Sequence, residues 1–157
     1  MKTEERRLTS AEATRAARDR RSKLIVLWVF VTLNYAYCDV LALMDRPYLK
    51  EVLTGNVGGI EMTRGHLLGA SILVEIPMAM VLLWWVLRPG ASRIASIIAG
   101  VVMALVQVGS LFVGGSPTPS YAFFSAIEIG TTAFIVWYAW TWPPRETRSI
   151  TLGGTRP

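Results

Sequence analysis

The feature that most constrains this fold is a set of four long apolar stretches that are nearly free of charge. They cover about residues 23–44, 64–87, 92–113 and 120–142, and each is close to the ~20 residues that a helix needs to cross a bilayer. Inside lipid, every backbone N–H and C=O group must be hydrogen-bonded within the protein, which favours helices for stretches of this length. The sequence therefore predicts an all-α, polytopic membrane protein built as a four-transmembrane-helix bundle.

Charge is scarce and unevenly placed along the chain. Charged residues make up 17% of the sequence, whereas a soluble domain has about a quarter. Eight of the 16 Lys and Arg residues lie in the first 23 positions, next to the first apolar stretch. This placement indicates contact of a basic N-terminal tail with anionic lipid headgroups. No nucleic-acid-binding module is present, so we expect lipid and not nucleic acid as the partner of these charges.

The distribution of Lys and Arg between the connecting segments predicts the orientation. Thirteen of the 16 lie in the N-terminal tail, in the turn between the second and third spans, or in the C-terminal tail. The positive-inside rule then places both termini in the cytoplasm of a multi-pass protein of the inner (plasma) membrane. We expect a cytoplasmic tail at 1–22, a transmembrane domain at 23–142 and a second cytoplasmic tail at 143–157.

The connection between the first two spans carries helix signals of its own. Asp45-Arg46-Pro47 is typical of a helix start with proline in the first turn, and Thr54-Gly55-Asn56 is typical of its end. Gly58-Gly59 then indicates a flexible turn. We expect a short interfacial helix followed by a loop.

Three of the predicted spans carry an acidic side chain well inside the membrane. By helical rise, Glu75 lies roughly 16 Å and Glu128 roughly 12 Å below the outer ends of their spans, and Asp39 lies roughly 24 Å from the inner end of its own. No Lys or Arg lies at comparable depth. An ionisable residue at such depth marks a functional site by default. We expect these acids to line one ligand or proton pocket, joined by four polar side chains: Asn34, Gln107, Ser125 and Thr132.

Pro77 follows Glu75 by two residues in the same span. Its ring removes one backbone hydrogen bond and frees the carbonyl of Leu73, which favours a kink beside the acid. We interpret Pro77 as a hinge.

The reactive residue types exclude several chemistries. His66 is the only histidine and Cys38 the only cysteine, so the chain has no intramolecular disulfide and no thiolate metal cluster. A single imidazole without a second ligand at suitable spacing indicates an interfacial histidine more than a metal site. We expect no catalytic residues, no metal and no cofactor.

Three functions remain open. The first is a protein that binds or moves a small solute, cation or proton through the pocket, with a small amphiphilic or cationic ligand. The alternative is a structural or partner subunit, or a homo-oligomer, in which the acids act as hydrogen-bonded glue between helices. A membrane-embedded isomerase, with one acid as proton donor and another as base, comes third.

Three sequence motifs carry a family resemblance. NYAYCDVLAL in the first span, ILVEIPMAMVLL in the second and SRIASIIAG at the start of the third resemble an uncharacterised family of small bacterial four-helix integral membrane proteins. The best marker is Glu75-Ile76-Pro77, and the resemblance covers about residues 23–142. It implies the four-helix fold and brings no assigned activity.

Overall fold

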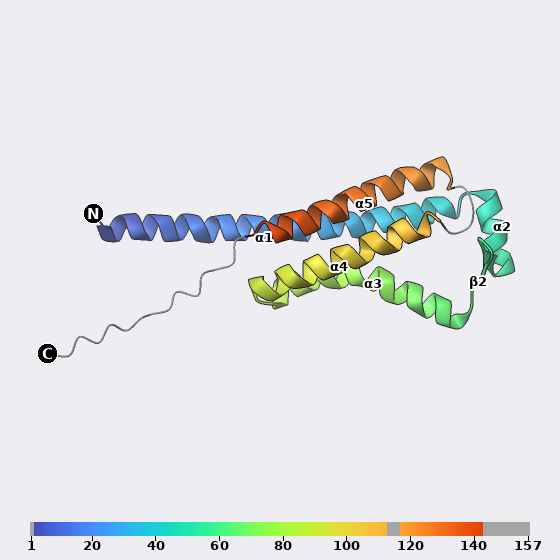
Figure 1. The fold of residues 1–157 in the computed structure, drawn as a ribbon, viewed down its shortest axis with the longest axis horizontal. Coiled ribbons are helices and arrows are strands. Elements are labelled where there is room, and N and C mark those ends of the chain that lie inside the picture. Colours follow the sequence, from blue (N-terminus) through green and yellow to red (C-terminus); the bar gives the residue numbers. More distant parts are fainter. Residues whose placement is uncertain (1, 113–116, 143–157) are drawn as a thin grey trace.

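The computed structural model describes residues 2–112 and 117–142 (Figure 1). Four of its helices are long and apolar enough to cross a membrane. The predicted all-α bundle, with a short helix between the first and second spans, is confirmed. The tail predicted at 143–157 lies outside the described residues. In chain order the elements are α1 (Lys2–Ala42), α2 (Arg46–Thr54), β1 (Asn56–Val57), β2 (Ile60–Glu61), α3 (Arg64–Val86), α4 (Pro89–Ser110) and α5 (Pro119–Trp140).

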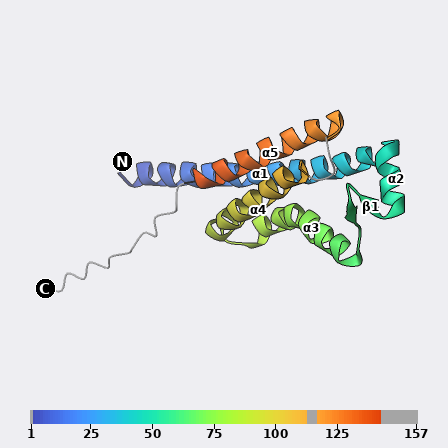
Figure 2. The same cartoon turned by 45° about the vertical axis from the view of Figure 1, so that its right-hand side comes forward.

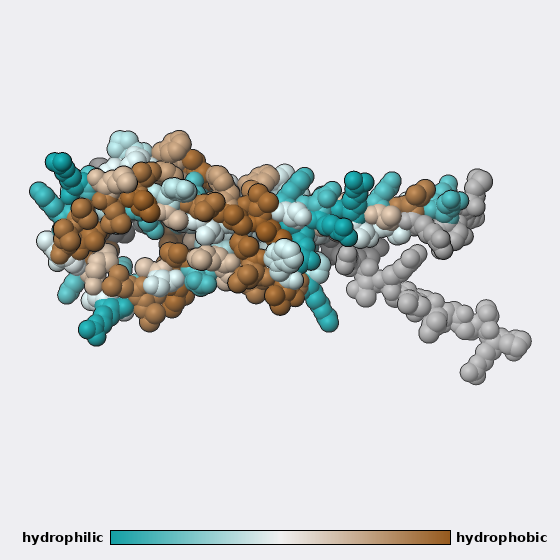
Figure 3. All heavy atoms as spheres, turned by 180° about the vertical axis from the view of Figure 1, so that it is seen from behind, coloured by the Kyte–Doolittle hydropathy of each residue, from teal (hydrophilic) through white to brown (hydrophobic). Residues whose placement is uncertain are grey.

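The four long helices form a ring in which α1 packs on α3, α3 on α4, α4 on α5 and α5 on α1. Figures 1 and 2 show neighbours in this ring running antiparallel, with the N-terminal part of α1 projecting beyond the other helices. The basic stretch and the first span thus form one continuous helix. Apolar side chains cover much of the bundle surface seen in Figure 3, whereas polar residues gather on the α1 projection. A surface of this kind implies contact with lipid.

Local sequence explains where the spans begin. The Thr63 hydroxyl accepts a hydrogen bond from the His66 backbone N–H at 3.2 Å and caps α3. Thr118 caps α5 in the same way, at 3.3 Å from the Tyr121 N–H. Such caps satisfy backbone donors that have no partner in the first helical turn. Pro89 and Pro119 start α4 and α5, where the missing N–H of proline removes no helical hydrogen bond.

The segment after α2 is more ordered than the loop we expected. β1 and β2 pair antiparallel, with Asn56 opposite Glu61 and Val57 opposite Ile60. The two turn residues have positive φ angles, 58° at Gly58 and 82° at Gly59, which glycine adopts without strain. Two such residues make the tight turn of a two-residue hairpin. The Gly58 N–H also donates to the Glu51 carboxylate at 2.8 Å, which joins the hairpin to α2.

A polar contact inside an apolar core closes one end of the bundle, which we call the Trp84 end; the opposite end is the α2 end. The Ser96 hydroxyl of α4 accepts hydrogen bonds from two indole N–H groups: Trp84 of α3 at 2.8 Å and Trp28 of α1 at 3.2 Å. The Trp84 ring stacks on Trp142 at a centroid distance of 5.8 Å. One small hydroxyl therefore ties three helices together. The surrounding core also contains Leu24, Val31, Met80, Ala99 and Ile135.

Two arginines hold the end of α5 at the Trp84 end. The Arg93 guanidinium donates to the Trp140 carbonyl at 2.9 Å. The Arg20 guanidinium donates to the Thr141 carbonyl at 3.5 Å and lies 5.6 Å from the centroid of the Tyr138 ring. The last carbonyls of a helix have no partner within it and carry partial negative charge, so cations stabilise them.

Pro77 marks the point where α3 leaves the bundle. It lies inside α3, is fully buried, and is followed by buried Met80 and Trp84. Toward the α2 end, residues 64–72 are all exposed. Figure 1 shows α3 bending partway along, so that its first half points away from α4. The Trp84 end is consequently packed, while the α2 end is spread apart.

Close packing of α4 against α5 depends on Gly100. A Cβ atom at Gly100 would lie 2.6 Å from Val136 Cγ2 of α5, and the β-branched valine has little rotamer freedom to move aside. We expect Gly100→Leu to lower the free energy of unfolding by about 1–3 kcal/mol through overpacking. Gly130→Leu is the matched control, because nothing lies within 4 Å of a Cβ atom there. Denaturation in detergent would measure both, and equal effects would contradict the packing role.

Candidate functional site

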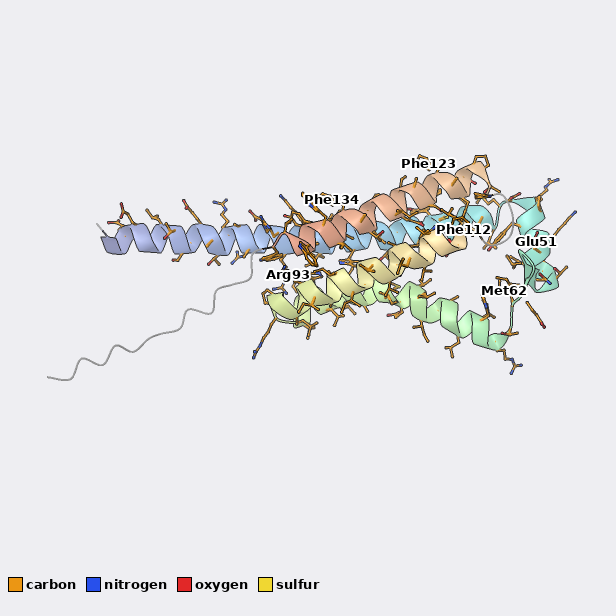
Figure 4. All side chains as sticks on the ribbon, in the orientation of Figure 1. Glu51, Met62, Arg93, Phe112, Phe123 and Phe134 are labelled. Atoms are coloured by element: carbon orange, nitrogen blue, oxygen red, sulfur yellow. The ribbon has the colours of Figure 1, made fainter. Side chains whose placement is uncertain are left out.

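A cavity of about 500 Å³ opens at the α2 end. Its walls come from the last turns of α1, from α2 and the hairpin, from the first turn of α3, and from the adjoining ends of α4 and α5. Figure 3 shows the molecule hollowed at this end, at the left of the view. Glu51 and Met62, two of the lining residues, are labelled there in Figure 4, whereas Arg93 lies at the Trp84 end. The cavity lies where α3 diverges from its neighbours.

The charged residues that line the cavity are mainly acidic. Asp39 of α1, Asp45 of the connection and Glu51 of α2 all contribute, and no Lys or Arg occurs among the described lining residues. The remaining titratable side chains of the wall are His66, Cys38, Tyr48 and Tyr121. The described lining residues therefore bring three carboxyl groups and no Lys or Arg side chain to this space.

Two tyrosines furnish aromatic surface and hydroxyl groups to the wall. The Tyr121 hydroxyl donates to the Ser110 hydroxyl at 2.7 Å, joining α5 to α4 beside the cavity. Partial burial, and next the nearby Asp39 carboxylate, raise the pKa of the Tyr48 phenol above its ordinary value. Since the ordinary value is already about 10, Tyr48 presents a neutral hydroxyl to the cavity at physiological pH.

A polar layer crosses the bundle between the cavity and the apolar core; we define it as Asn34, Tyr35, Gln107, Ser125, Glu128 and Thr132. Gln107 donates from its amide to the Ser125 hydroxyl at 2.8 Å, which joins α4 to α5. The Thr132 hydroxyl donates to the Glu128 backbone carbonyl at 2.7 Å, so it is occupied within its own helix.

Glu128 is the unusual member of this layer. Its side chain is 1% exposed, and neither carboxyl oxygen has a hydrogen-bond partner among the described residues. The same holds for two buried atoms of α1, Asn34 Oδ1 and the Tyr35 hydroxyl oxygen. Buried polar groups in proteins are nearly always hydrogen-bonded, and in this layer the described residues leave four such atoms without a partner.

The polar layer and the cavity adjoin each other. Glu128 interacts electrostatically with Tyr35 and Cys38 of α1, and also with Asp39. Cys38 and Asp39 themselves line the cavity. Successive residues of α1 therefore lead from the buried carboxyl group to the open space.

The structure brings together most of the residues that the sequence singled out. Gln107, Ser125, Glu128 and Thr132 are buried in the polar layer, and Asn34 is partly buried there. Asp39 lies in the cavity wall. Pro77 lies at the bend of α3.

Glu75 is not brought to this group. It is exposed and does not line the cavity. It lies two positions before buried Pro77, which is roughly 200° of helical rotation. Glu75 consequently shares the outward face of α3 with Leu68 and Leu82, which are 63% and 67% exposed.

Sequence reasoning missed several residues of the cavity wall. The sequence predicts only a helix start at Asp45, and its motifs give no site signal for Glu51, Tyr48 or Tyr121. The available signal was the density of acids in the connecting segment, where Asp45, Glu51 and Glu61 lie close to the end of the first span.

No group of three or more His, Cys, Asp or Glu side chains in the described parts of the chain is arranged to hold a metal ion. Asp39, Asp45 and Glu51 share a cavity without converging on one point. The arrangement suits a diffuse positive charge better than a tightly coordinated one, because hard metal ions require several oxygen ligands at short distance.

Comparison with known proteins gives one match. A family model described as "Family of unknown function (DUF6326)" matches residues 14–149. No curated protein and no solved structure matches the chain. The family match includes all three motifs on which the sequence resemblance was based, and it confirms that the resemblance is to an uncharacterised family.

Proposed function

The chain belongs to the DUF6326 family of unknown function, and we propose that this multi-pass membrane protein binds a small organic cation in the cavity at its α2 end. The single observation that carries this proposal is the composition of the cavity wall. Asp39, Asp45 and Glu51 line it together with two tyrosines, without a Lys or Arg among the described lining residues.

The chemistry of this wall selects the ligand class. Carboxylates attract a positive charge, and the faces of tyrosine rings attract cations through their quadrupole. Leu41, Val106 and Phe124 add apolar surface to the same cavity. A ligand with a delocalised positive charge and an apolar body would contact all three kinds of group, as most small-molecule sites combine apolar walls with a few polar contacts.

Because α3 bends at Pro77, we propose that the protein transports the cation as well as binding it. Residues 64–72 of α3 are all exposed, and this half of the helix connects through Thr63 to the hairpin that lines the cavity. In our proposal, this half moves with Pro77 as its hinge and changes access to the bound cation. The packed Trp84 end would stay fixed.

We propose the orientation from charge. Thirteen of the 16 Lys and Arg residues lie in the segment 1–23, in the turn between the second and third spans, or in the segment 143–157. The positive-inside rule supports a cytoplasmic location for the segments 1–22 and 143–157 and an inner (plasma) membrane location for the protein. The cavity would then open toward the outer side.

Glu75 favours a second candidate function, that of a subunit in a larger membrane assembly. Its carboxyl group lies on the outward face of α3 at mid-span, where contact with lipid is unfavourable for a polar group. A partner helix or a second copy would cover this face; oligomeric state in detergent, compared with Glu75→Leu, tests it.

Cation binding is tested with two ions of the same shape and opposite charge. Purified protein in lipid nanodiscs is titrated with tetraphenylphosphonium and, in parallel, with tetraphenylborate. We expect saturable binding of the phosphonium only, because the cavity charge attracts one ion and repels the other. Empty nanodiscs correct for partition into lipid. Equal binding of both ions, or no saturable binding of the phosphonium, would overturn the proposal.

A further inference from the structure

We infer that Glu128 releases a proton when an organic cation occupies the cavity, so that binding exchanges the cation for a proton. The inference rests on the proposed cation-binding function and adds to it the identity of the coupled ion. It is based on the position of Glu128 behind the cavity wall and on the absence of any hydrogen-bond partner for its carboxyl oxygens among the described residues.

Because Glu128 is buried, its carboxyl group needs either a bound proton or a positive charge nearby. A charged carboxylate taken out of water without a paired cation is unfavourable by several kcal/mol. Such a group is tolerated inside a membrane protein when it holds a proton or when a positive charge lies nearby. Without a ligand, the protonated form of Glu128 meets this requirement. When a cation enters the adjoining cavity, its positive charge allows Glu128 to be a carboxylate as well.

The groups that face Glu128 offer no internal cation. From α1 they are Asn34 and the titratable Tyr35, Cys38 and Asp39. From α4 the nearby polar member of the layer is Gln107, and its described amide contact is to Ser125. Glu75 of α3 is on the far side of its helix. The only charged side chain in this set besides Glu128 is another acid, so a positive charge must come from outside.

In this proposal the proton leaves along α1. The Tyr35 hydroxyl is buried, lacks a described partner and interacts electrostatically with Glu128. A hydroxyl group both donates and accepts, and it can therefore pass a proton onward without a net change. Cys38 and Asp39, one turn further along α1, line the cavity. The O–H bond of the Glu128 carboxyl group breaks, and the proton leaves to solvent through the cavity. The negative charge of the carboxylate then offsets the positive charge of the bound cation.

Proton release upon cation binding gives a direct test. Tetraphenylphosphonium has no titratable proton, so any proton that appears comes from the protein. In weakly buffered nanodisc samples containing a pH indicator, we expect release of about one proton per bound phosphonium. In the pH range where Glu128 is protonated before binding, the affinity for phosphonium should increase about tenfold for each unit rise in pH. In Glu128→Gln, which resembles the protonated acid in shape, the phosphonium should bind with no proton release and no such pH dependence.

The matched control is Glu75→Gln, the same substitution in another span, which should behave like wild type. His66 also lines the cavity and is therefore the alternative source of a released proton. Proton release that persists in Glu128→Gln and disappears in His66→Gln would assign the proton to the imidazole and overturn the inference. If Glu128→Gln fails to fold, infrared difference spectra of the wild-type protein replace it. Loss of a protonated-carboxyl band upon phosphonium binding supports the inference, and an unchanged band overturns it.

The two proposals fail in different ways. Wild-type protein that binds the phosphonium with no proton release at any pH overturns the role of Glu128 and leaves cation binding intact. Wild-type protein that does not bind the phosphonium overturns both.

Discussion

Trp84→Ala should lower the free energy of unfolding by about 3–5 kcal/mol, the largest effect on stability that we expect from one substitution. The ring is fully buried, its N–H donates to Ser96, and its face stacks on Trp142. Alanine would leave a cavity and remove a contact shared by three helices. Reversible unfolding in mixed detergent micelles, followed by circular dichroism, measures the change.

The adjacent residue gives the matched control. Trp85 is 73% exposed on the outer face of the same helix. Trp85→Ala removes an identical side chain without opening a cavity, so a change within about 0.5 kcal/mol is expected. Similar losses for both variants would show that the core at the Trp84 end does not control the stability of the bundle.

Asp39→Lys should abolish cation binding, the largest effect on function that we expect. The substitution replaces a negative charge in the cavity wall with a positive one. A change of two unit charges at roughly 6 Å, with an effective dielectric constant of ~20, corresponds to several kcal/mol. We therefore expect phosphonium binding to weaken by more than about 100-fold. Titration of the variant in nanodiscs measures it.

Glu61→Lys makes the same change of charge close to the cavity without altering its wall, because Glu61 is exposed on β2 and is not a lining residue. It should retain binding within a few-fold at physiological ionic strength, where screening weakens interactions between exposed charges. Loss of binding in Glu61→Lys, or retention in Asp39→Lys, would place the cation elsewhere.

The fold followed from the sequence because lipid restricts the choice of structure. Apolar length predicted four spans, and the Pro and Thr residues before the spans fixed where α3, α4 and α5 begin. The hairpin after α2 was harder to foresee, because Gly58-Gly59 allows a tight turn and a loose one equally. The Glu51 carboxylate accepts a hydrogen bond from the Gly58 N–H and stabilises the tight turn.

The site followed from the sequence only in part, for a physical reason. In a soluble helix the apolar face points inward, but a membrane helix is apolar on all sides. The pattern around Glu75 therefore carried no information about which side of α3 faces the bundle. Glu128 shares one face of α5 with Ser125 and Thr132, and all three are buried. The cavity wall combines residues from α2, the hairpin and the ends of the long helices, and local sequence patterns do not show how these segments come together.

The single cysteine also has a practical consequence. Cys38 is the only thiol in the chain, is 6% exposed, and lies in the cavity wall next to Asp39. A small thiol reagent can therefore attach to the native protein at only one position. Because this position lies in the cavity wall, we expect a bound ligand to slow the attachment, and no other cysteine has to be removed first. The wild-type sequence thus supplies its own sensor of occupancy.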